Sequence, residues 1–165
     1  MCIRDRAGED AKFGANVYEW KLNNVSQYSH LLSNPDYKDI LELQKKFSHI
    51  KENVEYILAI GGGSVTDTAK AIAAFRDKQE YLTDFVRNKK NPKVENPIKI
   101  IAVPTTSGTS SELTCWATIW DKEKNNKLSL AHKTLYAEKA IIDPSIMIDK
   151  PVSYTHLTLP TTPYV

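Results

Sequence analysis

Residues 56–70 have the sequence YILAIGGGSVTDTAK, in which a short apolar run is followed by three glycines and then by a helix-forming segment. The run at 56–60 is typical of a strand buried on both faces, and residues 64–75 carry the alanines of a helix that packs closely on a sheet. Glycines at such a junction let the backbone approach a ligand, and the first N–H groups of the helix favour a phosphate. The segment therefore predicts a strand, a phosphate-binding turn and a helix.

A second interpretation applies to two side chains of this turn. Ser64 and Asp67 have the S-x-x-D spacing of a capping pair, so both could serve only to complete the helix end. For the loop as a whole, the strand–glycine–helix context favours pyrophosphate binding. A Walker phosphate loop is excluded because no Gly-Lys-Ser/Thr sequence follows the glycines.

The same arrangement recurs forty residues later. Residues 98–103, IKIIAV, predict a second buried strand, and PTTSGTSSE follows at 104–112. Hydroxyl side chains can bond ribose or phosphate oxygens without adding charge. A turn with a helix beginning near Ser110 also accounts for Ser110, Ser111 and Glu112. Two such loops at the carboxyl ends of parallel strands predict a nucleotide crevice.

The remaining segments predict a mostly parallel α/β sheet, because strands alternate with helices. Asn34-Pro35-Asp36 is typical of a helix start, followed by an amphipathic helix over 36–51. A shorter helix is expected over 80–87. Residues 117–120 and 127–130 flank a polar turn and predict a hairpin, and a last strand is expected over 140–142.

Composition excludes several classes of protein. The 165 residues carry a net charge of +2, which is too balanced for a nucleic-acid-binding surface. No apolar run approaches the ~20 residues of a membrane helix, and no signal peptide is recognisable. Two cysteines, Cys2 and Cys115, provide neither a disulfide framework nor a zinc site. We therefore expect a cytoplasmic protein with no membrane or nucleic-acid partner.

The two ends differ from the rest of the chain. Residues 152–165, VSYTHLTLPTTPYV, contain no charged residue and no periodicity. This tail and the leader MCIRDR (residues 1–6) are both typical of translated sequencing-adapter sequence, so we expect neither to carry function and the tail to be poorly packed. Residues 7–151 are then expected to form an incomplete nucleotide-binding α/β domain, without its first strand.

Two motifs resemble a known family. GGGSVTDTAKAIA and PTTSGTSSE resemble the paired signatures of the iron-containing (group III) alcohol dehydrogenases, GGGSxxDxAK and PTTxGTGSE. The resemblance covers residues 14–150, with one departure at Ser110, where the family usually has glycine. It implies the Rossmann-like N-terminal domain of a two-domain fold shared with dehydroquinate synthase, the helical C-terminal domain being absent. The phrase TCWATIWDKEKNNKLSL resembles the phosphonoacetaldehyde-reductase branch.

The resemblance also implies residue roles. Gly62, Gly63, Ser64 and Asp67 would contact the pyrophosphate and ribose of NAD or NADP. The threonines Thr105, Thr106 and Thr109 would line the nicotinamide side, and Lys127 would reach a ribose. Members that prefer NAD tend to carry an acid where this chain has Ser29, so NADP is not excluded.

The family holds a divalent metal (Fe²⁺ or Zn²⁺) with an aspartate and three histidines, which would all lie beyond Asp149. His30, His49, His132 and His156 show no ligand spacing. We therefore expect no metal ligand and no catalytic residue in this chain, which would be inactive alone.

The resemblance implies hydride transfer between NAD(P) and a small alcohol or aldehyde, including phosphonoacetaldehyde, by a complete protein that is a homo-oligomer. The alternatives are a dehydroquinate-synthase-like or polyol-phosphate enzyme of the same fold, and a non-catalytic nucleotide-binding module.

Overall fold

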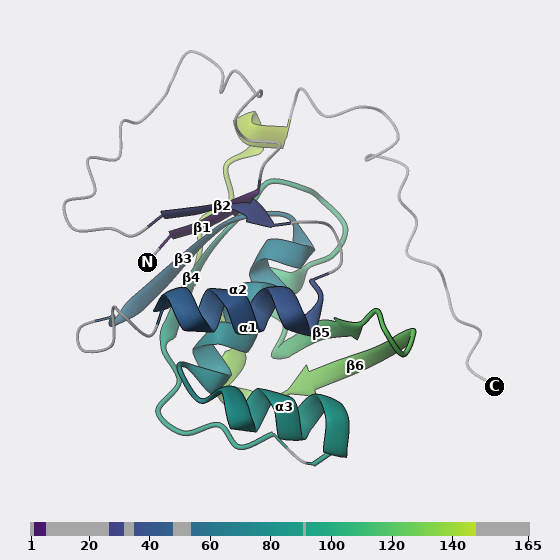
Figure 1. The fold of residues 1–165 in the computed structure, drawn as a ribbon. Helices are drawn as coiled ribbons and strands as arrows, with labels where there is room; N and C mark the ends of the chain where they lie inside the picture. The colour runs from purple at the N-terminus through teal and green to yellow at the C-terminus, as the bar shows by residue number, and fades with distance from the viewer. Residues whose placement is uncertain (1, 6–26, 32–34, 48–53, 91, 148–165) are drawn as a thin grey trace.

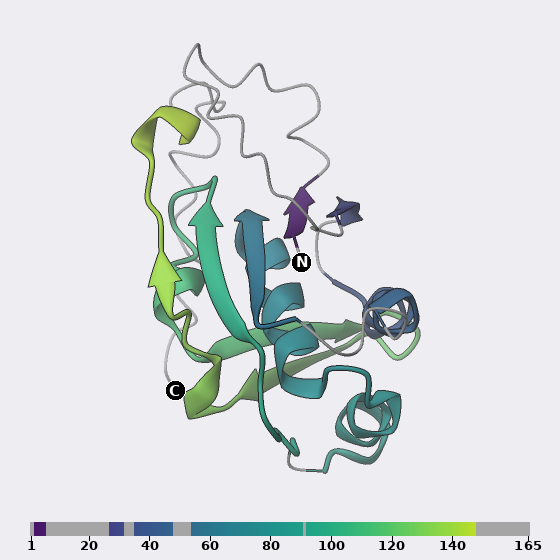
Figure 2. The same cartoon turned by 90° about the vertical axis from the view of Figure 1, so that its left-hand side faces the viewer.

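A computed structural model describes residues 2–5, 27–31, 35–47, 54–90 and 92–147. Its main sheet has five strands in the order β2-β1-β3-β4-β7, and every neighbouring pair is parallel (Figures 1 and 2). The strands are β1 (Cys2–Asp5), β2 (Gln27–Leu31), β3 (Tyr56–Gly61), β4 (Lys99–Pro104) and β7 (Lys139–Ala140). The predicted fold class, a Rossmann-like and mostly parallel sheet with helices, is confirmed.

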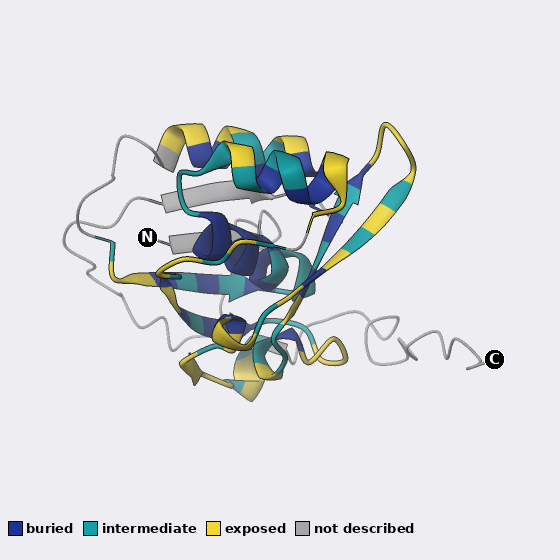
Figure 3. Ribbon diagram, turned by 90° about the horizontal axis from the view of Figure 1, so that it is seen from below, coloured by how far each residue is buried: buried dark blue, intermediate teal, exposed yellow. Residues whose placement is uncertain are grey.

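Among the described residues, three α-helices accompany the sheet, and one of them forms the centre of this part of the molecule. Helix α2 (Gly63–Phe75) lies between the sheet and a separate two-stranded hairpin, whereas α1 (Tyr37–Phe47) and α3 (Gln79–Asn88) lie further out (Figure 1). The described residues between Val65 and Phe75 are buried apart from Asp67 (Figure 3). The alanines predicted to allow close packing, among them Ala69, Ala71 and Ala73, are fully buried. Small side chains therefore let α2 contact layers on both sides.

The hairpin consists of β5 (Trp116–Asp121) and β6 (Asn126–Ala131), which pair antiparallel as the sequence predicted. Side chains on β5 alternate, because successive residues of a strand point to opposite faces. Ala117, Ile119 and Asp121 are buried, whereas Trp116 is 58% exposed. The opposite face of β5 therefore remains available to a ligand.

Contacts with the start of α1 fix the position of the hairpin. The N–H of Trp120 donates to the Pro35 carbonyl over 3.0 Å. The Asp36 carboxylate accepts from the N–H of Lys38 at 2.9 Å and from that of Lys122 at 3.1 Å. Asp36 thus caps α1 and ties it to the hairpin turn. The predicted cap, Asn34, lies outside the described residues.

The structure differs from several sequence expectations. The helix expected from Ser110 is a single 3₁₀ turn, Ser111–Leu113, because Ser110 has φ 47° and ψ 28° in the left-handed region and residue 114 is extended. The last strand covers Lys139–Ala140 rather than 140–142. Cys2–Asp5, which the sequence interpretation placed in a leader, forms β1 between β2 and β3, where a first strand was expected to be missing.

Two short 3₁₀ helices, Lys133–Leu135 and Pro144–Met147, complete the described elements. Residues 152–165 lie outside them, so the expectation for the tail stays a prediction. In the part of the chain that the structure describes, every helix is too short or too polar to cross a bilayer.

Candidate functional site

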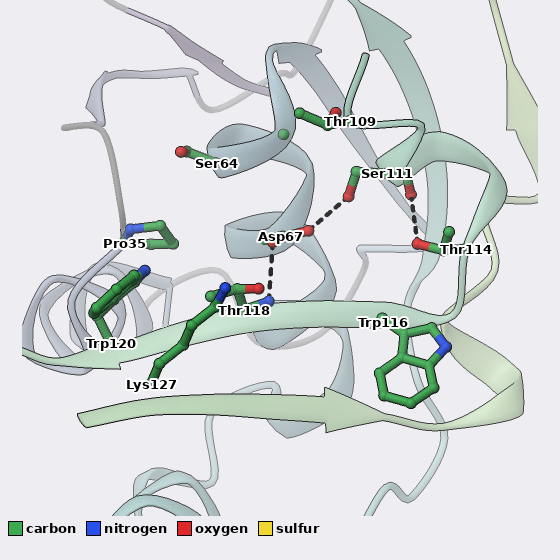
Figure 4. A pocket seen from close by; sticks show the side chains of 11 residues that line it. Pro35, Ser64, Asp67, Thr109, Ser111, Thr114, Trp116, Thr118, Trp120 and Lys127 are labelled. Carbon is green, nitrogen blue, oxygen red and sulfur yellow. Dashed lines mark hydrogen bonds between the residues drawn. The ribbon is translucent and has the colours of Figure 1, made fainter. Parts of the chain in front are cut away.

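A cavity of about 430 Å³ lies where the N-terminus of α2, the hydroxyl-rich loop and the hairpin meet (Figure 4). Side chains from α2 and the loop line one side of it, and alternate residues of β5 line the other. The lining residues are Pro35, Gly63, Ser64, Asp67, Thr109, Ser111, Thr114, Trp116, Thr118, Trp120 and Lys127. Both predicted loops therefore border one cavity at the carboxyl ends of adjacent strands.

The N-terminus of α2 points into this region without a side-chain cap. Gly62 occupies the cap position in extended conformation, and its carbonyl accepts from the N–H groups of Val65 and Thr66. Ser64 and Asp67 lie inside the helix, which begins at Gly63, rather than at its cap position. The interpretation of Ser64 and Asp67 as a capping pair is therefore wrong, because the carboxylate of Asp67 has other partners.

The Asp67 carboxylate joins α2 to the opposite wall. It accepts from the Ser111 hydroxyl at 2.6 Å and from the N–H of Thr118 at 2.9 Å (Figure 4). Burial raises the pKa of the Asp67 carboxyl, although both hydrogen bonds oppose that rise. Asp67 thus borders the cavity while both its oxygens hold the loop and β5 in place.

The two glycine-containing loops pack directly against each other. A Cβ atom on Gly62 would lie 3.0 Å from Thr106 Oγ1, and one on Gly63 would lie 2.9 Å from Thr109 Cγ2. The register of the sheet causes this approach, because Gly61 pairs with Pro104 where β3 and β4 end. The glycines are therefore required by loop packing as well as by any ligand.

Lys127 brings a positive charge to the cavity. It pairs with Trp120 across the hairpin, and its Nζ lies 5.8 Å from the centre of the Trp120 ring. Asp67 and Lys127 are the charged residues among those that line the cavity. Hydrogen bonds occupy the Asp67 oxygens, so Lys127 is the charged group of the lining that has donors available for an anionic ligand.

Five of the eight residues predicted from the sequence line the cavity: Gly63, Ser64, Asp67, Thr109 and Lys127. The other three are neighbours of it. Gly62 and Thr106 contact each other behind Gly63, and the N–H of Thr105 donates to the Gly61 carbonyl at 3.0 Å.

Sequence reasoning missed most of the hairpin wall, namely Trp116, Thr118 and Trp120, together with Pro35, Ser111 and Thr114. The period-two alternation of residues 116–121 could have identified the first three, because the hairpin itself was predicted.

Comparison with known proteins identifies the family. The model of a family described as iron-containing alcohol dehydrogenase matches residues 14–144, which is most of the chain. The chain belongs to the iron-containing alcohol dehydrogenase family. This membership confirms the family that the two motifs resemble.

The relatives that this chain matches are named for different compounds. Choline dehydrogenase of Bacillus subtilis is 37% identical over 109 residues, which are 66% of this chain and 27% of that protein. Among solved structures, NADH-dependent butanol dehydrogenase A of Thermotoga maritima has a TM-score of 0.77 at 27% identity and is matched over 93% of this chain and 39% of its own.

A protein whose structure was solved with a bound cofactor has the same fold as well. Sulfoacetaldehyde reductase of Bifidobacterium kashiwanohense, solved in complex with NAD⁺, has a TM-score of 0.80 at 24% identity, with 93% of this chain and 40% of that chain covered. The chain thus spans between 27% and 40% of the lengths of these three proteins.

The iron that gives the family its description finds no ligand set in the described part of this chain. There, no group of three or more His, Cys, Asp or Glu side chains is placed to hold a metal ion. His132 is engaged locally, since its Nδ1 accepts from the N–H of Thr134. The side chains of His30, His49 and His156 lie outside the description.

Proposed function

We propose that this chain binds the pyrophosphate of NAD or NADP in the cavity. It would contribute the cofactor-binding part of an oxidoreductase that transfers hydride between the nicotinamide and a small alcohol or aldehyde. The observation that carries the proposal is the N-terminus of α2, which has a glycine at its cap position and borders the same cavity as Lys127. A helix N-terminus and an ammonium group together favour a phosphate anion.

The chemistry of the cavity fits a dinucleotide. The backbone at Gly63 and the hydroxyl-bearing residues Ser64, Thr109 and Thr114 surround the phosphate position without adding negative charge. Asp67 is the one carboxylate in the lining, and its hydrogen bonds to Ser111 and Thr118 direct its oxygens into the protein. The exposed ring of Trp116 offers an apolar face at one end.

Each predicted residue has a role in this proposal. Gly62, Gly63 and Ser64 hold the pyrophosphate, and Lys127 pairs with a phosphate or reaches a ribose hydroxyl. Thr105, Thr106 and Thr109 form the nicotinamide side, while Asp67 orients the opposite wall. The nicotinamide supplies or accepts the hydride, and the residues of this chain orient it and exclude water.

The remaining features of the proposal concern the complete protein. It would be a cytoplasmic homo-oligomer that holds Fe²⁺ or Zn²⁺, acts on a small-molecule alcohol or aldehyde and needs no membrane or nucleic-acid partner. Since the described residues include no group of three or more His, Cys, Asp or Glu placed to hold a metal ion, we propose that the 165-residue chain binds nucleotide without turnover. Phosphonoacetaldehyde as substrate stays a prediction from the hairpin sequence.

Calorimetric titration of the 165-residue chain with NADH and with NADPH tests the proposal. We expect Lys127→Gln to weaken binding of the preferred nucleotide by about tenfold, since hydrogen bonds to a charged group are worth ~1.5–3 kcal/mol. Lys124→Gln is the matched control, because Lys124 is exposed on the hairpin turn and loses the same charge. No binding by the unaltered chain, or equal losses in both variants, would contradict the proposed site.

A further inference from the structure

Lys70 is a buried cation that the proposed binding site does not use directly. Its side chain extends from the middle of α2 and is fully buried. Three backbone carbonyls surround its ammonium: those of Ser111 and Thr114, each at 2.6 Å, and that of Trp116 at 2.8 Å. The Thr114 hydroxyl adds a fourth acceptor at 3.2 Å. All these acceptors belong to one segment, residues 111–116.

The placement of this charge is costly without such partners. Burial lowers the pKa of the Lys70 ammonium, and the nearby acids, foremost Asp67, oppose that effect without bonding to it. An ammonium has three N–H donors and no acceptor, so three carbonyls satisfy it completely. A buried apolar residue would avoid the desolvation cost altogether. The lysine therefore serves the segment that it binds.

The segment has two sets of contacts. The carbonyls of Ser111, Thr114 and Trp116 accept from Lys70, and the same three residues also line the cavity. The 3₁₀ turn at 111–113 is too short to hold its position by its own hydrogen bonds. Lys70 therefore sets the position of residues 111–116 relative to the N-terminus of α2, the helix to which Lys70 belongs.

We propose that Lys70 is a positioning residue for the cofactor: its ammonium fixes residues 111–116 at the distance from Gly63 and Ser64 that a bound dinucleotide requires. The inference rests on the proposed function. Asp67 lies one turn earlier on α2 and binds Ser111 of the same segment, as well as Thr118 just beyond it, so two residues of α2 hold this side of the cavity. The helix that binds the phosphate thereby also places the facing wall.

The test compares three variants of the 165-residue chain: Lys70→Met, Lys70→Arg and the control Lys46→Met. Lys70→Met keeps the aliphatic stem but leaves three carbonyls unpaired, Lys70→Arg keeps charge and donors, and Lys46 is exposed on α1. The affinity for NADH is measured by calorimetry at a temperature where circular dichroism shows each variant to be folded. Urea denaturation gives stability separately.

A positioning role predicts that folded Lys70→Met binds NADH more weakly by about tenfold or more, that Lys70→Arg recovers part of this loss, and that Lys46→Met is unchanged. A purely structural role would lower the urea midpoint of Lys70→Met and leave the NADH affinity of the folded variant intact, which would overturn the inference. If Lys70→Met does not fold, Lys70→Arg decides: weakened binding by the folded protein supports the inference, and unaltered binding contradicts it.

Failure of both Lys70 variants to fold would assign the lysine to overall stability and would also overturn the inference. The failure of the underlying proposal has a different signature. If the unaltered chain binds neither NADH nor NADPH, the proposed function falls and the positioning role with it. If the unaltered chain binds and Lys70→Met binds equally well, only the positioning role falls.

Discussion

At the scale of single residues, Ser110 is the one departure from the family signature, and its backbone explains why glycine is usual there. Its φ of 47° and ψ of 28° lie in the left-handed region, which costs a residue with a Cβ roughly 1–2 kcal/mol. Glycine avoids that cost but loses about 0.5–1 kcal/mol of chain entropy on folding. The serine therefore carries strain that a glycine would remove.

We expect Ser110→Gly to raise the free energy of unfolding by about 0.5 kcal/mol, which is the difference between these two effects. Urea denaturation of the 165-residue chain measures it. Ser110→Ala serves as the control, because alanine keeps the Cβ and should bring no gain. A destabilised Ser110→Gly variant would show that the serine side chain makes a contribution larger than the strain.

At the scale of elements, the contact between the two loops is tighter than ordinary packing. An added Cβ at Gly63 would lie within 3.1 Å of three Thr109 side-chain atoms, so Gly63→Ala must push the hydroxyl-rich loop away from α2. We expect a loss of about 1–3 kcal/mol in the free energy of unfolding, as in overpacked cores.

A double-mutant cycle with Thr109→Ala identifies the cause of that loss. Removal of Cγ2 and Oγ1 from Thr109 makes room, so the double variant should be more stable than the sum of the two single effects predicts. Additive losses, measured by urea denaturation, would mean that Gly63 matters for its own backbone rather than for the facing threonine.

Elements with a local pattern could be predicted from the sequence. The apolar runs of β3 and β4, the helix after the glycines and the hairpin around the polar turn were all recognisable, because their periodicity lies within a few residues. Strand β2, with the sequence QYSHL, was not, since it has no continuous apolar run and owes its place in the sheet to pairing with β1.

The candidate site was predictable only in part, for a related reason. The sequence identified the loops, because glycines and hydroxyls cluster there, but the opposite wall arises from non-local packing of the hairpin against α2 and Pro35. The roles of Asp67 and Lys70 were also hidden, because their partners lie more than forty residues away. A capping pattern within α2 was the simpler local interpretation of Asp67, and it was wrong.

At the scale of the whole molecule, two carboxyls should shape the pH dependence of unfolding in opposite ways. Burial raises the pKa of Asp67 in the folded chain, so its contribution to stability is present below the ordinary aspartate range of ~3.9 and is lost as pH rises through the raised pKa. Hydrogen bonds from Lys90 and Asn88 lower the pKa of Asp84, whose contribution is present above that range and is lost as pH falls.

We therefore expect the stability of the unaltered chain, relative to Asp67→Asn, to fall as pH rises above about 4. The asparagine can still accept from the N–H of Thr118 and donate to the Ser111 hydroxyl, so the variant should remain folded. Relative to Asp84→Asn, the stability of the unaltered chain should rise as pH rises toward about 4 and should then level off, because the pKa of Asp84 is lowered. Urea midpoints across a pH series give both slopes, and equal signs would refute the assignment.

The burial of α2 on both sides affects how its sequence changes during evolution. Its alanines Ala69, Ala71 and Ala73 are fully buried, so selection for folding alone would preserve them. A descendant that had lost its cofactor would diverge first at Lys127, which faces the cavity, while the helix kept its ancestral sequence. Under the proposed function, the alanines of α2 therefore record descent, and Lys127 records whether nucleotide is still bound.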